Sequence, residues 1–240
     1  MKLLAVDTAT EACSAALFID GEIVERFELA PKAHTKLILP MIDSLMAEAG
    51  LKPTDLDALA FGRGPGSFTG VRIATGVIQG IAFGADLPVV PVSTLAAMAQ
   101  DFFEKQDKDR VSTRTQGVLP ANVAFTAMDA RMGEIFWGVY QCGQLGIVEL
   151  LGEEAVTLAE RVEFPQLNGV GIGSGWGVYK DTLMSRLGRL VSHSEVDFLP
   201  RAGVIAKLGA AGFIQGLAVS VEHAMPVYLR DKVAKKESER

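Results

Sequence analysis

The sequence predicts an α/β protein built from two related lobes. A buried strand, an acidic turn and a hairpin follow one another around Asp7, and the same order returns around Asp129, about 120 residues later. Apolar strand segments alternate with helical stripes in both halves, which is typical of α/β folds. The expected parts are a first lobe (1–103), a linker (104–117), a second lobe (118–229), whose final segment could return to the first, and a charged, flexible tail (230–240).

The first half carries the clearer signals of secondary structure. Asp20-Gly21 is a two-residue hairpin signal, and Gly50 closes a helical stripe that begins at His34. A glycine-rich turn then joins a strand to a helix. The expected elements are strands 2–6, 13–19, 22–27, 57–61 and 88–92, and helices 34–49, 70–85 and 93–103.

The second half gives weaker signals of the same kind. The segment 104–117, which precedes it, is polar and mixed in charge, as linkers usually are. Within the second lobe, the expected elements are strands 123–127, 133–140, 146–151 and 170–175, and helices 179–187 and 201–215.

Composition and charge narrow the possible functions. With 240 residues, of which 49% are apolar, the chain can bury a large core, and its net charge of −6 argues against a direct grip on a nucleic acid backbone. Cys13 and Cys142 give neither a disulfide framework nor a metal-ligand spacing, so we expect a reducing, cytoplasmic environment. Asp7 comes too early for a signal peptide, and no uninterrupted apolar stretch is long enough to span a bilayer.

The turn over 62–72 could cradle a phosphate, because backbone N–H groups at the start of a helix attract anions. However, it lacks the Gly-Lys-Ser/Thr of a Walker A loop, and Ser67 stands where a dinucleotide fingerprint needs its third glycine. Pro65 argues against a nucleophile elbow at Ser67. We therefore interpret the segment as a tight structural turn.

The two acidic turns could together hold a magnesium nucleotide between the lobes. The residues concerned are Asp7, Thr8 and Asp129, and the segment 171–176 could face an adenine. The alternative is that both aspartates accept hydrogen bonds from nearby backbone N–H groups.

The histidines do not form a metal-binding pattern. His34, His193 and His223 are scattered, and no His-x-x-x-His pair is present. His34 lies near a helix start, where a capping or surface position is the usual one. A metalloenzyme is therefore not expected.

Two helices are the best candidates for contact with another protein. In helix 70–85, glycines recur every fourth residue and lie on one face, although each costs about 1 kcal/mol relative to alanine. Helix 34–49 is apolar over more than one narrow stripe, which indicates a partner or a self-dimer. Packing inside the chain is the alternative for both. The candidate interface residues are His34, Leu37, Ile38, Met41, Ile42, Leu45, Arg72, Gly76, Gly80 and Gly84.

Several segments resemble the bacterial TsaB (YeaZ) family, from residue 1 to about residue 232. The most specific is Gly64-Pro65-Gly66-Ser67-Phe68-Thr69-Gly70-Val71-Arg72. The others are Asp7-Thr8-Ala9-Thr10, His34-Thr35 with Leu39-Pro40-Met41-Ile42, Asp129-Ala130-Arg131 with Gly133-Glu134, and Pro226-Val227-Tyr228-Leu229-Arg230. The resemblance implies an actin/Hsp70-like ATPase (ASKHA) fold of two RNase-H-like lobes, with mixed sheets flanked by helices.

The resemblance also implies a role in making N6-threonylcarbamoyladenosine (t6A) at adenosine 37 of tRNAs that read codons starting with A. In this family's pathway TsaC makes threonylcarbamoyl-AMP, TsaD transfers the threonylcarbamoyl group to the adenosine, and TsaE is an ATPase. By resemblance, this chain is a non-catalytic subunit that pairs directly with TsaD, meets TsaE in the complex and contacts tRNA only indirectly. ATP and magnesium then belong to the partner subunits and the metal to TsaD, with no cofactor in this chain.

One departure from TsaD supports this division of roles. TsaD-type proteins carry a metal-binding His-x-x-x-His after the strand that follows the glycine-turn helix. Thr94 and Met98 stand at those two places here, and neither can replace an imidazole on iron or zinc. We therefore expect no catalytic residue and no metal. Two alternatives stay open: an independent magnesium-ATP-binding ATPase or kinase of the same fold, and a TsaD-related metallopeptidase, which the missing ligands disfavour.

Overall fold

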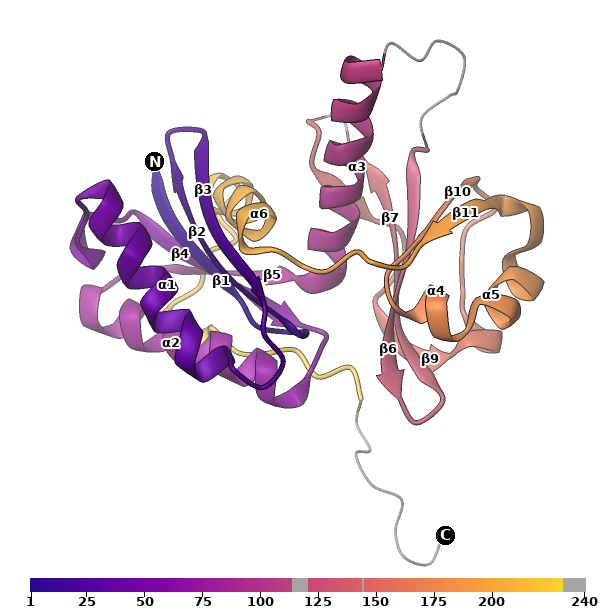
Figure 1. Ribbon diagram of the computed structural model, residues 1–240, viewed down its shortest axis with the longest axis horizontal. Helices are drawn as coiled ribbons and strands as arrows, with labels where there is room; N and C mark the ends of the chain where they lie inside the picture. The colour runs from indigo at the N-terminus through magenta and orange to yellow at the C-terminus, as the bar shows by residue number, and fades with distance from the viewer. Residues whose placement is uncertain (114–120, 144, 231–240) are drawn as a thin grey trace, which may run out of the picture.

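The computed structural model describes residues 1–113, 121–143 and 145–230 and places them in two lobes side by side (Figure 1). Each lobe is built around a mixed β-sheet that is covered by helices. This arrangement confirms the predicted α/β architecture of two lobes.

The first sheet consists of β1 (Lys2–Asp7), β2 (Ala12–Ile19), β3 (Glu22–Leu29), β4 (Ala58–Gly64) and β5 (Val89–Ser93). Its strand order is β3-β2-β1-β4-β5. β1, β2 and β3 pair antiparallel, whereas β4 runs parallel to β1 and β5 parallel to β4. The predicted hairpin at Asp20-Gly21 is present, with the positive φ angles of 49° and 101° that such a turn requires.

The second sheet consists of β6 (Val123–Arg131), β7 (Glu134–Cys142), β8 (Val148–Leu150), β9 (Ala155–Leu158), β10 (Gly169–Ile172) and β11 (Val191–Glu195). Its order is β11-β10-β6-β7-β8, with β9 also paired to β7. β7 is antiparallel to β6, and β10 and β11 continue in parallel. Aligning β6 with β1 gives the order of the first sheet, which supports the predicted repeat. The sequence did not indicate β9 or β11.

The helices are α1 (His34–Ala49), α2 (Phe68–Ala85), α3 (Thr94–Thr113), α4 (Gly175–Val178), α5 (Lys180–Leu187) and α6 (Ala202–Ile214), with short 3-10 turns at Pro53–Asp55, Ala159–Arg161, Gly188–Leu190 and Val221–His223. α1 and α2 share one core with the first sheet, through Ile38 and Ile78. α4 and α5 pack on the second sheet through Trp176 and Leu183. Met98 of α3 joins a separate core on that sheet.

The helix expected at 201–215 packs on the first lobe, although the sequence assigned it to the second. An added Cβ on Gly209 of α6 would stand 2.6 Å from the Cβ of Ala60 in β4, so the helix lies very close to the sheet. Ser14 Oγ accepts a hydrogen bond from the backbone N of Ala202 at 3.0 Å. The small residues on α6 permit this close approach. The chain has thus returned to the first lobe by about residue 201.

The linker expected over 104–117 is helical in its described part, because α3 continues to Thr113. Residues 114–117 lie outside the described residues. Lys105 Nζ contacts the Asp101 carboxylate at 2.7 Å, one helical turn earlier, and Lys207 Nζ of α6 contacts Glu104 at 2.8 Å. The described part of the segment that looked like a linker is thus helix, in which Glu104 and Lys105 form ion pairs.

Among the described residues, α2 is the one helix long and apolar enough to cross a membrane by length and composition. Core helices of soluble proteins pass the same test. Val71, Ala74 and Ile78 of α2 are buried, and Ala74 and Ile78 lie in the core that α2 shares with the first sheet. We therefore describe α2 as a core helix with one open face.

Two glycine substitutions test this packing in opposite directions. Gly209→Ala pushes a Cβ against Ala60 and is expected to destabilise the chain by about 1–3 kcal/mol. Gly80→Ala in α2 meets no atom within 4 Å and is expected to stabilise by up to about 1 kcal/mol through helix propensity. Urea unfolding of the isolated chain measures both. A stabilised Gly209→Ala variant would contradict the close contact between α6 and the sheet.

Candidate functional site

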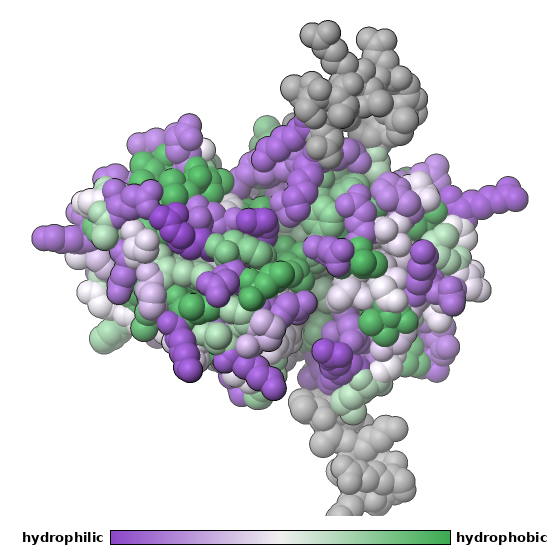
Figure 2. All heavy atoms as spheres, viewed as in Figure 1, coloured by the Kyte–Doolittle hydropathy of each residue, from purple (hydrophilic) through white to green (hydrophobic). Residues whose placement is uncertain are grey.

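The glycine face of α2, defined by Arg72, Gly76, Gly80 and Gly84, is exposed. A Cβ added to any of its three glycines would meet nothing within 4 Å. Phe83 beside it is 81% exposed. Hence nothing among the described residues of this chain covers the three glycines, whereas Arg72 contacts Phe68 and Tyr228. On the side of the molecule drawn in Figure 2, hydrophobic residues reach the surface in small groups separated by polar ones.

The stripe on α1 has a different role from the one predicted. His34, Ile38, Ile42 and Leu45 are buried. Leu37 and Met41 are partly buried against the same core, which includes residues of β2, β4 and α2. The interpretation of these residues as a partner surface is therefore wrong for the four buried ones. α1 packs against a sheet and a helix at once, and that is why its apolar stripe is wide.

His34 holds the start of α1 and is buried, so the surface position is wrong and a role at the helix start is the one observed. Its Nε2 lies 2.9 Å from the carbonyl oxygen of Thr10 and 3.2 Å from that of Ala12. Because both partners are acceptors, Nε2 must carry the proton and donate it. The side chain thereby ties α1 to the turn that follows β1.

The glycine turn is the tight structural turn that the sequence predicts. An added Cβ would stand 2.5 Å from the carbonyl oxygen of Ala9 at Gly66, and 2.0 Å from that of Thr8 at Gly70. The backbone N of Ser67 donates to the Ala9 carbonyl at 2.7 Å, and Ser67 Oγ caps α2 by accepting from Gly70 N at 3.3 Å. The turn thus packs against the lobe's own backbone.

Asp7 and Thr8 do not face an open cleft, so the predicted nucleotide site is not formed at these residues. Both are fully buried. Asp7 Oδ1 accepts from the backbone N of Ala9 at 3.1 Å, while Oδ2 has no partner among the described residues and lies under Gly62. Burial raises the pKa of Asp7 to about 7. Thr8 Oγ1 donates to the Gly70 carbonyl at 2.6 Å.

Asp129 accepts a hydrogen bond from a nearby backbone N–H group, which is the alternative to a role in nucleotide binding. Its Oδ1 accepts from the backbone N of Arg131 at 2.9 Å, and its Oδ2 lies 3.2 Å from the Arg131 guanidinium. Trp176 is also unavailable to an adenine, because it is fully buried and donates from Nε1 to the Phe125 carbonyl at 2.7 Å. Asp7, Thr8 and Asp129, the residues of the predicted nucleotide cleft, therefore do not converge on a ligand.

A largely buried polar cluster joins the two lobes. Glu154 accepts hydrogen bonds from Ser93 at the end of β5 and from Tyr140 of β7. Its second carboxylate oxygen lies 3.6 Å from the Arg63 guanidinium of β4. Burial, followed by the Glu154 charge, raises the pKa of Tyr140 well above its usual value, so the phenol remains a donor. The chain's own side chains thus occupy space between the lobes.

Thr94 and Met98, the two residues that the resemblance matches to metal ligands of TsaD, are core residues. Thr94 and Met98 are both fully buried, and Thr94 Oγ1 donates to the carbonyl of Pro65. Within the described part of the chain, no group of three or more His, Cys, Asp or Glu residues could hold a metal.

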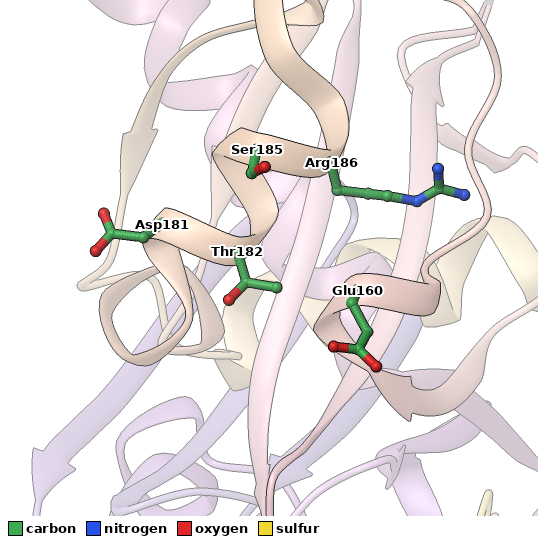
Figure 3. Close-up of a pocket in the computed structure, with 5 residues that line it drawn as sticks. All are labelled: Glu160, Asp181, Thr182, Ser185 and Arg186. Carbon is green, nitrogen blue, oxygen red and sulfur yellow. The ribbon is translucent and has the colours of Figure 1, made fainter.

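A shallow pocket of about 500 Å³ lies on the second lobe, between α5 and the 3-10 turn Ala159–Arg161. Its lining residues are Glu160, Asp181, Thr182, Ser185 and Arg186 (Figure 3). The two carboxylates and the guanidinium point apart, and Arg186 donates to the Val162 carbonyl at 3.4 Å. These groups do not converge, so the pocket offers no arrangement for catalysis.

Asp7 gives a testable dependence of stability on pH. In the folded chain its pKa is about 7 instead of 3.8, so the folded state binds more protons and stability falls as pH rises from about 4 to about 7. Since one pKa unit corresponds to about 1.4 kcal/mol, ionised Asp7 costs about 4 kcal/mol above pH 7. Asp7→Asn should remove this loss, so that the variant is more stable than the wild type at pH 8.

Urea unfolding of both proteins at pH 5 and pH 8 measures this difference. Asp43→Asn is the control, because Asp43 is an exposed residue of α1 in the same lobe. Equal changes in wild type and Asp7→Asn between the two pH values would show that Asp7 does not titrate in this range.

Comparisons with known proteins place the chain among tRNA-modification proteins. A family model described as "TsaD: tRNA N6-adenosine threonylcarbamoyltransferase" matches residues 27–237. The tRNA threonylcarbamoyladenosine biosynthesis protein TsaB of Escherichia coli is 45% identical over 238 residues, covering 98% of this chain and 96% of that protein. The protein of the same name from Haemophilus influenzae is 38% identical over 242 residues, covering 97% and 95%.

A solved structure agrees with the sequence relatives. YeaZ from Pseudomonas aeruginosa gives a TM-score of 0.83 at 41% identity, over 95% of this chain and 99% of that chain. The two mixed sheets with flanking helices are the actin/Hsp70-like fold that the resemblance implied. The chain therefore belongs to the TsaB family of tRNA threonylcarbamoyladenosine biosynthesis proteins.

Proposed function

We propose that this chain is a non-catalytic subunit that pairs with a TsaD-type subunit and supports it in forming t6A at adenosine 37 of tRNA. The observation that carries the proposal is the uncovered glycine face of α2. Three exposed helix glycines cost about 1 kcal/mol each in the isolated chain. A partner helix that packs closely against the backbone offsets this cost, since only glycine permits that approach.

The buried residues support the assignment of catalysis to the partner. Thr94 and Met98 are buried core residues at the places of the TsaD metal ligands, and Asp7 lies under Gly62. ATP, magnesium and the catalytic metal therefore belong to the partner subunits in this proposal. The net charge of −6 favours indirect contact with tRNA, and the protein works in the cytoplasm.

The pairing also creates the place where a TsaE-type ATPase joins the complex. A second copy of this chain is the competing occupant of the glycine face, because a self-complementary helix face can form a twofold dimer. An independent ATPase or kinase is less well supported, since the Asp7 carboxyl is buried and has no open path to a nucleotide. A metallopeptidase would need metal ligands that the described residues do not bring together.

Gly76→Leu and Gly80→Leu test the proposal directly. Each places a large side chain on the outer face of α2, where the isolated chain has open space, so the fold should survive. A partner helix would be pushed outward, and affinity for the TsaD-type subunit of the same cell should fall at least about tenfold. Light scattering on a sizing column identifies the complex, and titration calorimetry measures the affinity.

Ser185→Leu is the matched control, because Ser185 is exposed on α5 of the second lobe. It should leave the affinity unchanged. If the glycine variants bind as tightly as the wild type, the glycine face is not the interface. If the wild type forms no complex at micromolar concentration, the proposed pairing is wrong, and titration with magnesium and ATP becomes the next measurement.

A further inference from the structure

The segment Ala224–Arg230 runs from the first lobe to the second (Figure 1, yellow). Gln79 of α2 donates from Nε2 to the Ala224 carbonyl at 2.9 Å. The backbone N of Val227 donates to the carbonyl of Arg63, in β4, at 2.8 Å. The segment is irregular, yet specific hydrogen bonds hold it to the first lobe at several points.

Its main contact with α2 involves a residue of the glycine face. Arg72 Nε donates to the hydroxyl oxygen of Tyr228 at 2.7 Å. The Arg72 guanidinium also lies over the Phe68 ring, 3.5 Å from its centroid, and 5.4 Å from the centroid of Tyr228. Cation–π contacts of this kind add to the hydrogen bond. Phe68 and Tyr228 are 53% and 45% exposed, so a protein seated on the glycine face would reach both.

Its far end is held by the β6–β7 hairpin of the second lobe. Arg230 donates from Nε and Nη2 to Glu134 Oε2, at 3.0 and 2.6 Å. Nη2 also lies 3.0 Å from the Ala130 carbonyl and 3.2 Å from that of Arg131. Arg230 was assigned to the flexible tail, and that assignment is wrong for this residue. The remaining residues of the tail, 231–240, lie outside the described residues.

We infer that Ala224–Arg230 is a strap that couples the glycine face of α2 to the position of the second lobe. Its α2 contact is Arg72–Tyr228, and its second-lobe contact is Arg230–Glu134. A short segment fixed at both ends restricts the angle between the lobes. A ligand that alters the Arg72–Tyr228 contact therefore alters this restriction, and linkage requires the reverse effect as well. The identity of that ligand as a TsaD-type subunit rests on the proposed function.

The distance between the lobes tests the strap in the isolated chain. Spin labels at Thr54→Cys and Ser185→Cys report it, because both positions are exposed and lie in different lobes. Cys142→Ser removes the exposed native thiol, while Cys13 is buried. Arg230→Glu and Tyr228→Phe remove one contact at each end of the strap. Both should broaden the distance distribution and speed hydrogen exchange at the Val227 amide.

Charge reversal controls for general damage to the fold. Glu134→Arg combined with Arg230→Glu should restore at least part of the narrow distribution, because the reversed pair can still form. Arg189→Glu, a charge reversal at an exposed position of the second lobe, should have no effect. An unchanged distribution in Arg230→Glu overturns the strap. Broadening in Arg230→Glu but not in Tyr228→Phe overturns its coupling to α2.

A second measurement extends the test to the partner. Arg230→Glu lies outside the glycine face, yet coupling should change affinity for the TsaD-type subunit by about fivefold or more, with recovery in the reversed pair. Equal affinity in wild type and Arg230→Glu overturns the coupling to the occupied face. If the wild type does not bind that subunit, the proposed function fails, whereas the strap is still decided by the label distances in the isolated chain.

Discussion

The close contact between the glycine turn and the turn after β1 is the constraint on which the first lobe depends. Gly66 and Gly70 lie against the carbonyls of Ala9 and Thr8 at distances that leave no room for a side chain. Since Ser67 caps α2 directly after this contact, the contact also fixes where the helix begins and which face turns outward. The position of the glycine face is thus a consequence of the backbone packing at the turn that precedes α2.

The turn after β1 also lacks the exposed carboxylate that a magnesium nucleotide site would need. Gly62 lies over the Asp7 carboxyl, whose burial keeps it neutral until about pH 7. Between the lobes, Glu154 accepts hydrogen bonds from Ser93 of the first lobe and Tyr140 of the second. A fold whose two lobes can enclose a ligand is here held together by its own side chains. The glycines on the outer face of α2 remain open among the described residues, and the proposed function lies there for that reason.

Local patterns in the sequence predicted most of the strands, the glycine turn and the repeat of two lobes, because these depend on neighbours in the chain. These local patterns could not predict which segment packs against each face of a helix. The width of the α1 stripe was assigned to a partner, whereas Ile38 and Leu45 fill the core between sheet and helix. The burial of Asp7 and the placement of α6 depend on contacts between distant segments, such as Gly209 against Ala60, and no local pattern reports these. The open space beside Gly76 and Gly80 agrees with their periodic spacing.

The chain passes between the lobes three times, and the three crossings differ in strength. α3 is a helix whose residues enter the core of the second lobe, and the segment before α6 is tied to the first sheet by Ser14 and the Arg201–Glu25 ion pair. The strap has no regular secondary structure and depends on a few hydrogen bonds and ion-pair contacts, which places it at the low end of local stability. Of the three, it is therefore the crossing that a protein bound at α2 can most readily alter. Its contact with Arg72 puts that sensitivity beside the exposed glycine face of α2.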